Sequence, residues 1–159
     1  MLTRRELLGG AAALAALAWA RRAGAIGPAS KFRFGQLQIG AGTSWNPRPR
    51  ALERLAWEIS KRTSIDVDLP AVPVAPTSDT LHETPFLYLS GERAFDLPST
   101  AGIDALRRFL TFGGFLLIDS AEGSTDGAFD ASVRKLITAI FPAPEKGLEI
   151  ISADHVVFK

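Results

Sequence analysis

The chain contains no cysteine, and this absence removes several kinds of chemistry at once. Disulfide bonds, thiolate metal sites, iron–sulfur clusters and cysteine nucleophiles all require that side chain. Histidine is also scarce, with 2 residues in 159, so a zinc site built only from protein ligands is not expected. The sequence therefore predicts a domain without a bound metal or cofactor.

An excess of charge of either sign is also missing. The 18 lysines and arginines nearly balance the 17 aspartates and glutamates, which leaves a net charge of +1. Residues 1–25 contain 4 of the basic residues and 1 of the acidic ones, so 14 basic and 16 acidic residues remain after them. A surface of that charge has no electrostatic attraction for a phosphate backbone, and we expect no nucleic acid as a partner.

The N-terminus carries the pattern of an export signal. Arg4 and Arg5 precede an apolar run over 7–20, and Ala23-Gly24-Ala25 then supplies the small residues of a cleavage site. The paired arginines followed by two leucines are typical of twin-arginine signals. The apolar run, about 14 residues long, is shorter than the roughly 20 residues that a membrane-spanning helix needs.

This pattern defines the expected domain organisation. We expect a twin-arginine signal peptide over 1–25, a short linker over 26–31 and one domain over 32–159. The mature protein is then periplasmic and has no stable membrane span. A general secretory signal, or an uncleaved signal that anchors the chain, is the alternative.

Apolar segments of strand and helix type alternate along the rest of the chain. Three helices are expected: one that begins near 47–49, one between Ser99 and Gly113, and one over 128–140. The five expected strands are 32–39, 65–69, 86–89, 115–118 and 148–151. This alternation predicts an α/β three-layer sandwich with a mostly parallel sheet, and we favour a flavodoxin-like strand order.

Local signals refine the expected boundaries. Three prolines predict a loop over 70–78, since proline is excluded from central strands. Asn46 is the expected N-cap of the first helix, and Ser99 or Thr100 that of the second. A slip in the alternation at Gly35-Gln36 predicts a β-bulge. The run over 115–118 has no polar alternation, so both of its faces are expected to be buried.

Ligands of open α/β sheets bind outside the carboxyl ends of the strands. Three segments, 40–45, 90–95 and 119–126, follow expected strands and are predicted to form one rim. The first lacks the third glycine of a dinucleotide-binding loop and the lysine of a phosphate loop, so a tight turn on which Trp45 packs is the alternative there. The ligand-binding candidates on the rim are Gly42, Thr43, Ser44, Trp45, Ser90, Gly91, Asp119 and Ser120.

Three polar residues are candidates for catalysis at this rim. Asp119 follows a buried strand, where a carboxylate can act as a base or hold hydroxyl groups. Glu122 lies on the same loop, and His155 follows the last expected strand. The structural alternatives are an Asp119 that bonds the amides of its own loop and a His155 that is held in a structural hydrogen bond.

Several ordered segments resemble one bacterial family. The most specific are Pro85-Phe86-Leu87-Tyr88 and Gly113-Gly114-Phe115-Leu116, with Asp154-His155-Val156-Val157-Phe158 closing the match. Over 32–159 the chain resembles the DUF4159 family, a bacterial domain of unknown function. The resemblance implies an exported or membrane-tethered α/β domain similar to class I glutamine amidotransferases and flavodoxins. Because similar proteins continue beyond the Asp-His segment, it also implies a C-terminally truncated domain.

Two departures from the family pattern weaken a catalytic role. Ser120 stands where the family often has a second aspartate, and Glu92-Arg93 stand where a histidine often follows the glycine that matches Gly91. Glutaminase activity is excluded because its thioester requires a cysteine. We expect a non-catalytic module of the cell envelope whose partner is an envelope protein or a small ligand. The alternative is a hydrolase or carbohydrate-acting enzyme that uses a rim carboxylate.

Overall fold

The structure is a computed structural model that describes residues 31–42, 44–124, 126–142 and 147–159. The expected signal peptide, with Arg4, Arg5, Ala23 and Ala25, lies outside the described residues. So do residues 26–30 of the expected linker and the candidate Thr43.

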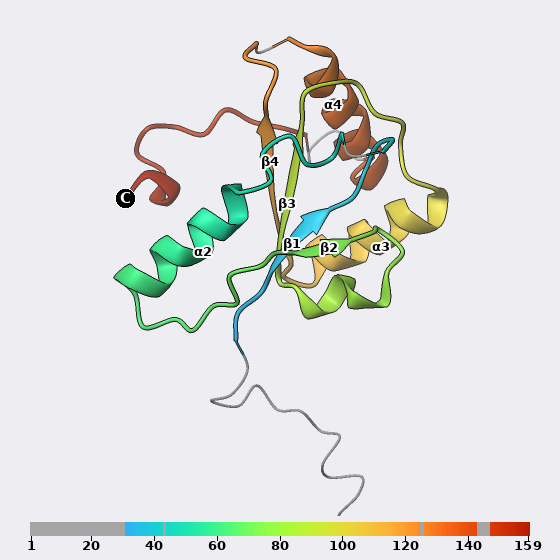
Figure 1. The fold of residues 1–159 in the computed structure, drawn as a ribbon. Coiled ribbons are helices and arrows are strands. Elements are labelled where there is room, and N and C mark those ends of the chain that lie inside the picture. Colours follow the sequence, from blue (N-terminus) through green and yellow to red (C-terminus); the bar gives the residue numbers. More distant parts are fainter. Residues whose placement is uncertain (1–30, 43, 125, 143–146) are drawn as a thin grey trace, which may run out of the picture. The chain divides into compact units, whose positions relative to one another are not determined.

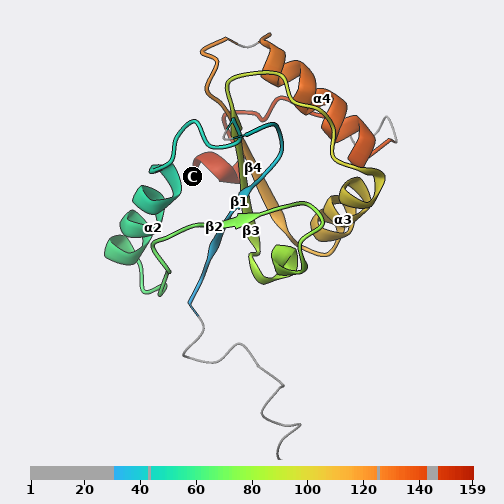
Figure 2. The same ribbon diagram turned by 45° about the vertical axis from the view of Figure 1, so that its right-hand side comes forward.

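Four strands form one parallel sheet in the order β2-β1-β3-β4 (Figure 1). Helix α2 lies on one face of the sheet, and helices α3 and α4 lie on the other (Figure 2). This arrangement confirms the predicted three-layer α/β fold, and the order is that of flavodoxin-like sheets. The elements are β1 (Phe34–Leu37), α2 (Ala51–Arg62), β2 (Val72–Val74), η1 (Asp79–Glu83), β3 (Phe86–Gly91), α3 (Thr100–Thr111), β4 (Phe115–Ser120), α4 (Ala128–Ile140) and η3 (Val156–Phe158).

The two central strands are buried on both faces. Leu37, Leu87 and Leu89 point toward α3 and α4 and are inaccessible to solvent. On the opposite face, Phe34 and Tyr88 pack with the apolar side of α2. Burial of such side chains stabilises a domain by about 1.5–3 kcal/mol each before the entropy cost of folding is subtracted.

Strand β1 pairs without the predicted bulge. Its residues advance one for one against β2 and against β3. The slip in alternation instead reflects burial of all four residues, because a central parallel strand has no solvent face. Gly35 fits here because a Cβ atom at this position would lie 2.6 Å from Leu87 Cδ2.

The second strand lies further along the chain than predicted. Within 65–69, Val67 alone makes a β contact, an isolated parallel bridge to Phe32. Strand β2 instead places Pro73 opposite Gln36. The prediction of a loop over all of 70–78 was wrong, because β2 is an edge of the sheet and tolerates a residue that donates no ladder bond there.

Strand β4 is the other edge, and one of its faces is open. Leu116 and Ile118 pack against the core beneath α3 and α4. Phe115 and Leu117 belong to the opposite face and are 53% and 40% exposed. The prediction that both faces are buried was therefore wrong, because α2 packs on Phe34 and Tyr88 of the two central strands and leaves the edge strand open.

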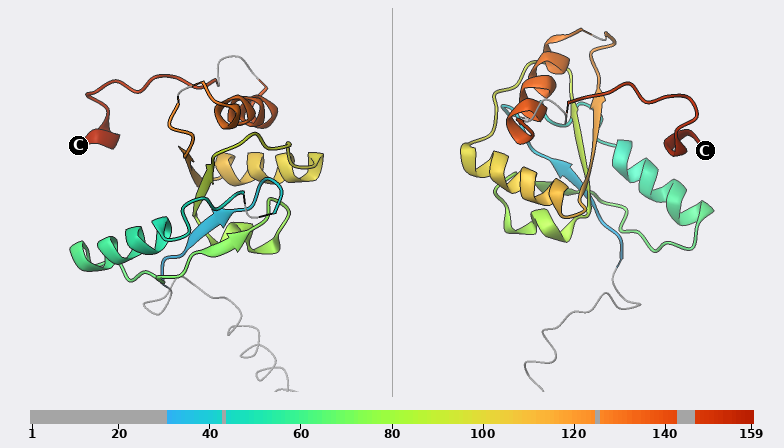
Figure 3. Two further views of the ribbon diagram at one scale, coloured as in Figure 1. Left: turned by 45° about the horizontal axis from the view of Figure 1, so that its top comes forward. Right: turned by 180° about the vertical axis from the view of Figure 1, so that it is seen from behind.

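The segment after α4 forms no strand in its described part. Residues 148–151 make no ladder pairing, and Ile150 is fully exposed, so the expected fifth strand is absent there. His155 instead begins the short helix η3. This segment lies on the α2 side of the sheet (Figure 3).

The helix boundaries follow local hydrogen bonds. The predicted cap of α3 is confirmed, since Ser99 accepts a hydrogen bond from the Gly102 amide. Asn46 does not cap α2, which begins at Ala51 after Arg50 and has no side-chain cap. None of the helices in the described part of the chain combines the length and the apolar character needed to cross a membrane.

Candidate functional site

Asp119 is the centre of a polar cluster at the carboxyl end of β4. Its Oδ2 atom accepts hydrogen bonds from the Tyr88 hydroxyl at 2.6 Å and from Arg48 Nη1 at 2.9 Å. The three residues come from β4, from β3 and from the loop before α2, so the cluster joins three segments distant in sequence. Asp119 thus accepts hydrogen bonds from side chains of other segments, which differs from the structural alternative in which it bonds the amides of its own loop.

Tyr88 is the neutral member of this cluster. Burial raises the pKa of its hydroxyl above the ordinary value of 10.0, and the hydrogen bond to the Asp119 carboxylate raises it further. The Ser90 hydroxyl and the Arg48 guanidinium act in the opposite direction. The phenol therefore stays protonated and donates to Asp119 under physiological conditions.

Ser90 lies beside Asp119 in the register of β3 and β4. Its side chain is 1% exposed, and the Oγ atom makes no hydrogen bond in the structure, although it is close enough to influence the pKa of Tyr88. A buried hydroxyl without a partner has a desolvation cost that nothing offsets. The structure thus brings together two of the predicted ligand-binding residues, Ser90 and Asp119.

The loop after β1 is held by hydrogen bonds to itself and to the sheet. Ser44 Oγ donates to the Ala41 carbonyl, and Trp45 Nε1 donates to the Gly42 carbonyl, both at 2.8 Å. Gln36 of β1 then donates to the Trp45 carbonyl at 2.9 Å. Gly42 has a positive φ of 59°, which favours glycine. These contacts describe the tight turn that was the alternative for this segment.

Gly91 and Ser120 pair across the ends of β3 and β4. A Cβ atom on Gly91 would lie 2.2 Å from the Phe129 ring, so glycine permits the close approach of α4. Ser120 Oγ accepts a hydrogen bond from the Glu122 amide at 3.3 Å. Both residues therefore make contacts that shape the loop after β4.

Glu122 and His155 are bonded away from Asp119. The Glu122 carboxylate accepts the amide of Phe129 at 3.0 Å and that of Asp130 at 3.4 Å, so it caps the first turn of α4. His155 Nδ1 accepts from the Val157 amide at 3.3 Å in the exposed C-terminal segment. Among the described residues, no group of three or more histidine, aspartate or glutamate side chains could hold a metal ion.

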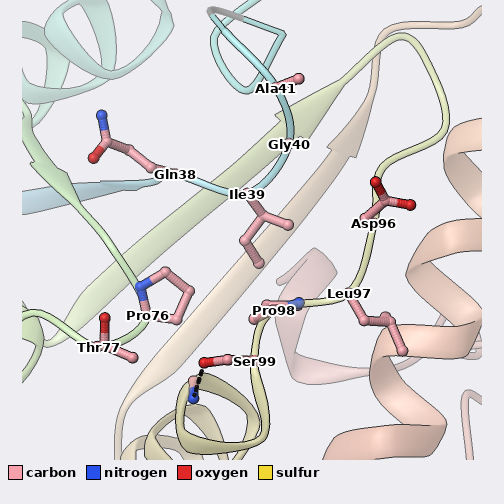
Figure 4. A pocket seen from close by; sticks show the side chains of 11 residues that line it. Gln38, Ile39, Gly40, Ala41, Pro76, Thr77, Asp96, Leu97, Pro98 and Ser99 are labelled. Carbon is pink, nitrogen blue, oxygen red and sulfur yellow. Dashed lines mark hydrogen bonds between the residues drawn. The ribbon is translucent and has the colours of Figure 1, made fainter.

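A crevice of about 430 Å³ opens at the same edge of the sheet (Figure 4). It is lined by 38–41 after β1, by 76–77 after β2, and by 96–99 with Gly102 after β3. Its volume falls in the range of small-molecule sites, roughly 300–1,000 Å³. The chain leaves β1 toward α2 on one face and leaves β3 toward α3 on the other. The crevice therefore lies at the topological switch point, where open α/β sheets bind ligands.

Most residues of the crevice and two members of the Asp119 cluster were not predicted from the sequence. Arg48 was not among the predicted site residues, and Tyr88 was named only within the segment that carries the family resemblance. Asp96 to Ser99 follow β3 immediately after the predicted rim segment. The signal that could have found the crevice residues is their place just after the end of a strand. The predicted segment after β3 had to be a few residues longer, and the second strand had to be placed at β2.

These features define a class: a parallel α/β domain of flavodoxin-like strand order with a crevice at its switch point. The chain belongs to the DUF4159 family, a domain of unknown function, whose family model matches residues 33–159. No curated protein matches the chain.

Proposed function

We propose that this domain is a non-catalytic module of the cell envelope that binds a small ligand in the switch-point crevice. The observation that carries the proposal is the meeting of the loops after β1, β2 and β3 around one cavity of ligand size. Loops at this edge are positioned by a rigid sheet, which is the usual basis of a preformed site.

Binding is favoured over turnover by the side chains that line the crevice. In the part of the chain that the structure describes, they include hydroxyls, an amide and one carboxylate, but no histidine, lysine or cysteine. The three catalytic candidates occupy other positions, and each has a separate partner: Asp119 with Tyr88 and Arg48, Glu122 with the α4 amides, and His155 with its own turn. A nucleophile with an adjacent base is therefore not assembled by these residues.

The envelope location rests on the N-terminal pattern of paired arginines, a short apolar run and Ala23-Gly24-Ala25. A module that is exported after folding and needs no disulfide agrees with the absence of cysteine. Its proposed partner is a small molecule of the envelope.

A thermal-shift screen of the purified chain tests this function. The library contains sugars, nucleotides, amino acids and cell-wall fragments, and each compound is compared on the wild type, Ala41→Leu and Ala131→Leu. Ala41 is exposed at the mouth of the crevice, whereas Ala131 is exposed on α4 and serves as the matched control. A ligand at 100 times its Kd stabilises the folded state by about 2.7 kcal/mol.

We expect at least one compound to stabilise the wild type and Ala131→Leu but not Ala41→Leu. A library without such a compound would contradict the crevice as a binding site. Turnover of a bound compound that disappears in Asp119→Asn would instead establish an enzyme and overturn the non-catalytic proposal.

A further inference from the structure

The side chains of the crevice carry one charge, and it is negative. Asp96 is the sole charged residue among the described residues of the lining, and it is exposed. Among the described residues it has no ion-pair partner, and the arginine nearest in sequence, Arg93, pairs with Glu92 at 3.4 Å. An anionic ligand in this crevice would therefore meet an unneutralised carboxylate.

The helix end at the crevice is also poorly suited to an anion. Anion sites at helix N-termini use free backbone amides. Of the three first-turn amides, those of Thr100, Ala101 and Gly102, only Gly102 belongs to a residue that lines the crevice, and its amide is bonded to Ser99 Oγ. Pro98, directly before the cap, has no N–H group to offer. The usual phosphate-binding geometry of a switch-point crevice is thus replaced by a capped helix beside a carboxylate.

The remaining lining is apolar at the centre, and its margins combine polar side chains with the exposed apolar residues Ala41 and Leu97. Figure 4 shows Ile39, Pro76 and Pro98 around the middle of the crevice, with Gln38, Thr77 and Asp96 around them. Ile39 is 5% exposed and belongs to the core, so this apolar surface is fixed by packing. Such a surface complements a ligand that has C–H groups on one side and hydroxyl groups along its edge.

From these observations we infer that the crevice takes a hydroxyl-rich ligand of the saccharide class that carries no negative charge, with Asp96 as the acceptor of its hydroxyl protons. This inference rests on the proposed function and specifies its ligand. A carboxylate is an acceptor-only group and forms short, strong hydrogen bonds with O–H donors. A polyol supplies those donors, whereas a phosphate supplies acceptors and negative charge.

The test compares neutral sugars with their phosphorylated counterparts. Isothermal titration of the purified chain uses a panel of neutral mono- and disaccharides and the monophosphate of each. The variants are Asp96→Asn, which keeps the shape and removes the charge, and Asp79→Asn, an exposed aspartate outside the crevice that serves as the control. Ala41→Leu reports whether any bound sugar occupies the crevice.

We expect a neutral sugar to bind the wild type, the Asp79→Asn control to bind equally well, and Asp96→Asn to bind about tenfold more weakly, the loss of one charge-assisted hydrogen bond. Its monophosphate should bind more weakly to the wild type than the neutral parent does. Tighter binding of the monophosphate would overturn the inference. The inference would also be overturned if no saccharide binds but another library compound does, and if Ala41→Leu abolishes the binding of that compound. In that case the crevice is still a binding site. If Ala41→Leu abolishes the binding of no compound at all, the proposed function itself is contradicted.

Discussion

Tyr88 and Asp119 share a hydrogen bond that links the charge of the phenol to folding. The pKa of the phenol is raised in the folded state, first by burial and then by the carboxylate. The folded chain therefore keeps this proton at pH values where the unfolded chain has lost it. The stabilisation is fully present below the unfolded pKa of 10.0 and is lost as the pH rises through the higher folded pKa.

We predict that the free energy of unfolding of the wild type falls more steeply above pH 10 than that of Tyr88→Phe. Urea unfolding at intervals between pH 8 and pH 11 measures the two slopes. Because Tyr88 is the one tyrosine of the chain, phenolate absorbance follows its titration directly. Parallel slopes for the two proteins, or a phenol that titrates alike in folded and unfolded chains, would contradict the prediction.

Substitution by alanine is expected to have opposite effects on stability at the neighbouring positions Gly91 and Ser90. A Cβ atom at 91 meets the Phe129 ring at 2.2 Å, so we predict that Gly91→Ala destabilises the fold by about 1–3 kcal/mol through overpacking. Ser90→Ala removes a buried hydroxyl without a partner and should be neutral or stabilising. Denaturant midpoints compare both variants, and Phe129→Leu should restore part of the loss in the Gly91→Ala background.

The position of Asp119 could be predicted from the sequence, but its partners could not. A carboxylate directly after a buried strand must lie at the carboxyl edge of a parallel sheet, and this holds whatever the loops do. Arg48 reaches it through the path of a loop whose turns depend on Gln36 and Trp45. Such long-range geometry has no local signature in the sequence.

Arg107 joins two helices on the same face of the sheet. Its Nε donates to the Ile140 carbonyl at 2.7 Å and its Nη2 to the Ala139 carbonyl at 2.9 Å. The cation of α3 thus satisfies carbonyl groups at the C-terminal end of α4, where the helix dipole favours positive charge.

We predict that Arg107→Lys lowers the free energy of unfolding by about 1–2 kcal/mol, since an ammonium group cannot reproduce the forked contact. Arg108→Lys on the next, exposed position is the matched control and should leave stability within about 0.5 kcal/mol. Chemical denaturation measures both variants. If the two variants lose the same free energy of unfolding, the contact of Arg107 with α4 does not stabilise the fold.

The two edge strands mark where strand prediction fails. Strand β2 contains a proline, and β4 is an unbroken apolar run, so local rules assign the first to a loop and the second to the sheet centre. The rule that excludes proline and the rule that reads an apolar run as buried both apply to central strands, and the local sequence does not specify whether a strand is central or at an edge. The central strands β1 and β3, in contrast, were predicted, because their hydrophobic residues are typical of strands that are buried in the core.

Export concerns the molecule as a whole. We predict that the combined Arg4→Lys and Arg5→Lys variant remains in the cytoplasm with its first 25 residues attached, whereas the wild type reaches the periplasm as a protein that begins at Ile26. Cell fractionation and mass spectrometry of the intact protein measure both properties. Arg21→Lys with Arg22→Lys is the control for loss of arginine pairs as such. Periplasmic accumulation of the Arg4→Lys, Arg5→Lys variant would contradict a twin-arginine signal.

The order β2-β1-β3-β4 also has a kinetic consequence. Gln36 of β1 and Tyr88 of β3 are hydrogen-bonded across 52 residues, and the pairing of β1 with β2 likewise spans the whole of α2. All neighbouring strands of the described sheet are parallel, so none of these pairs can close as a hairpin, and loop entropy must be lost before any of their ladders forms. Folding is therefore limited by the meeting of distant segments at β1. For the export of a folded chain that is proposed above, the delay before export is therefore set by β1, which is the first strand to be synthesised and completes its pairing only when β3 is available.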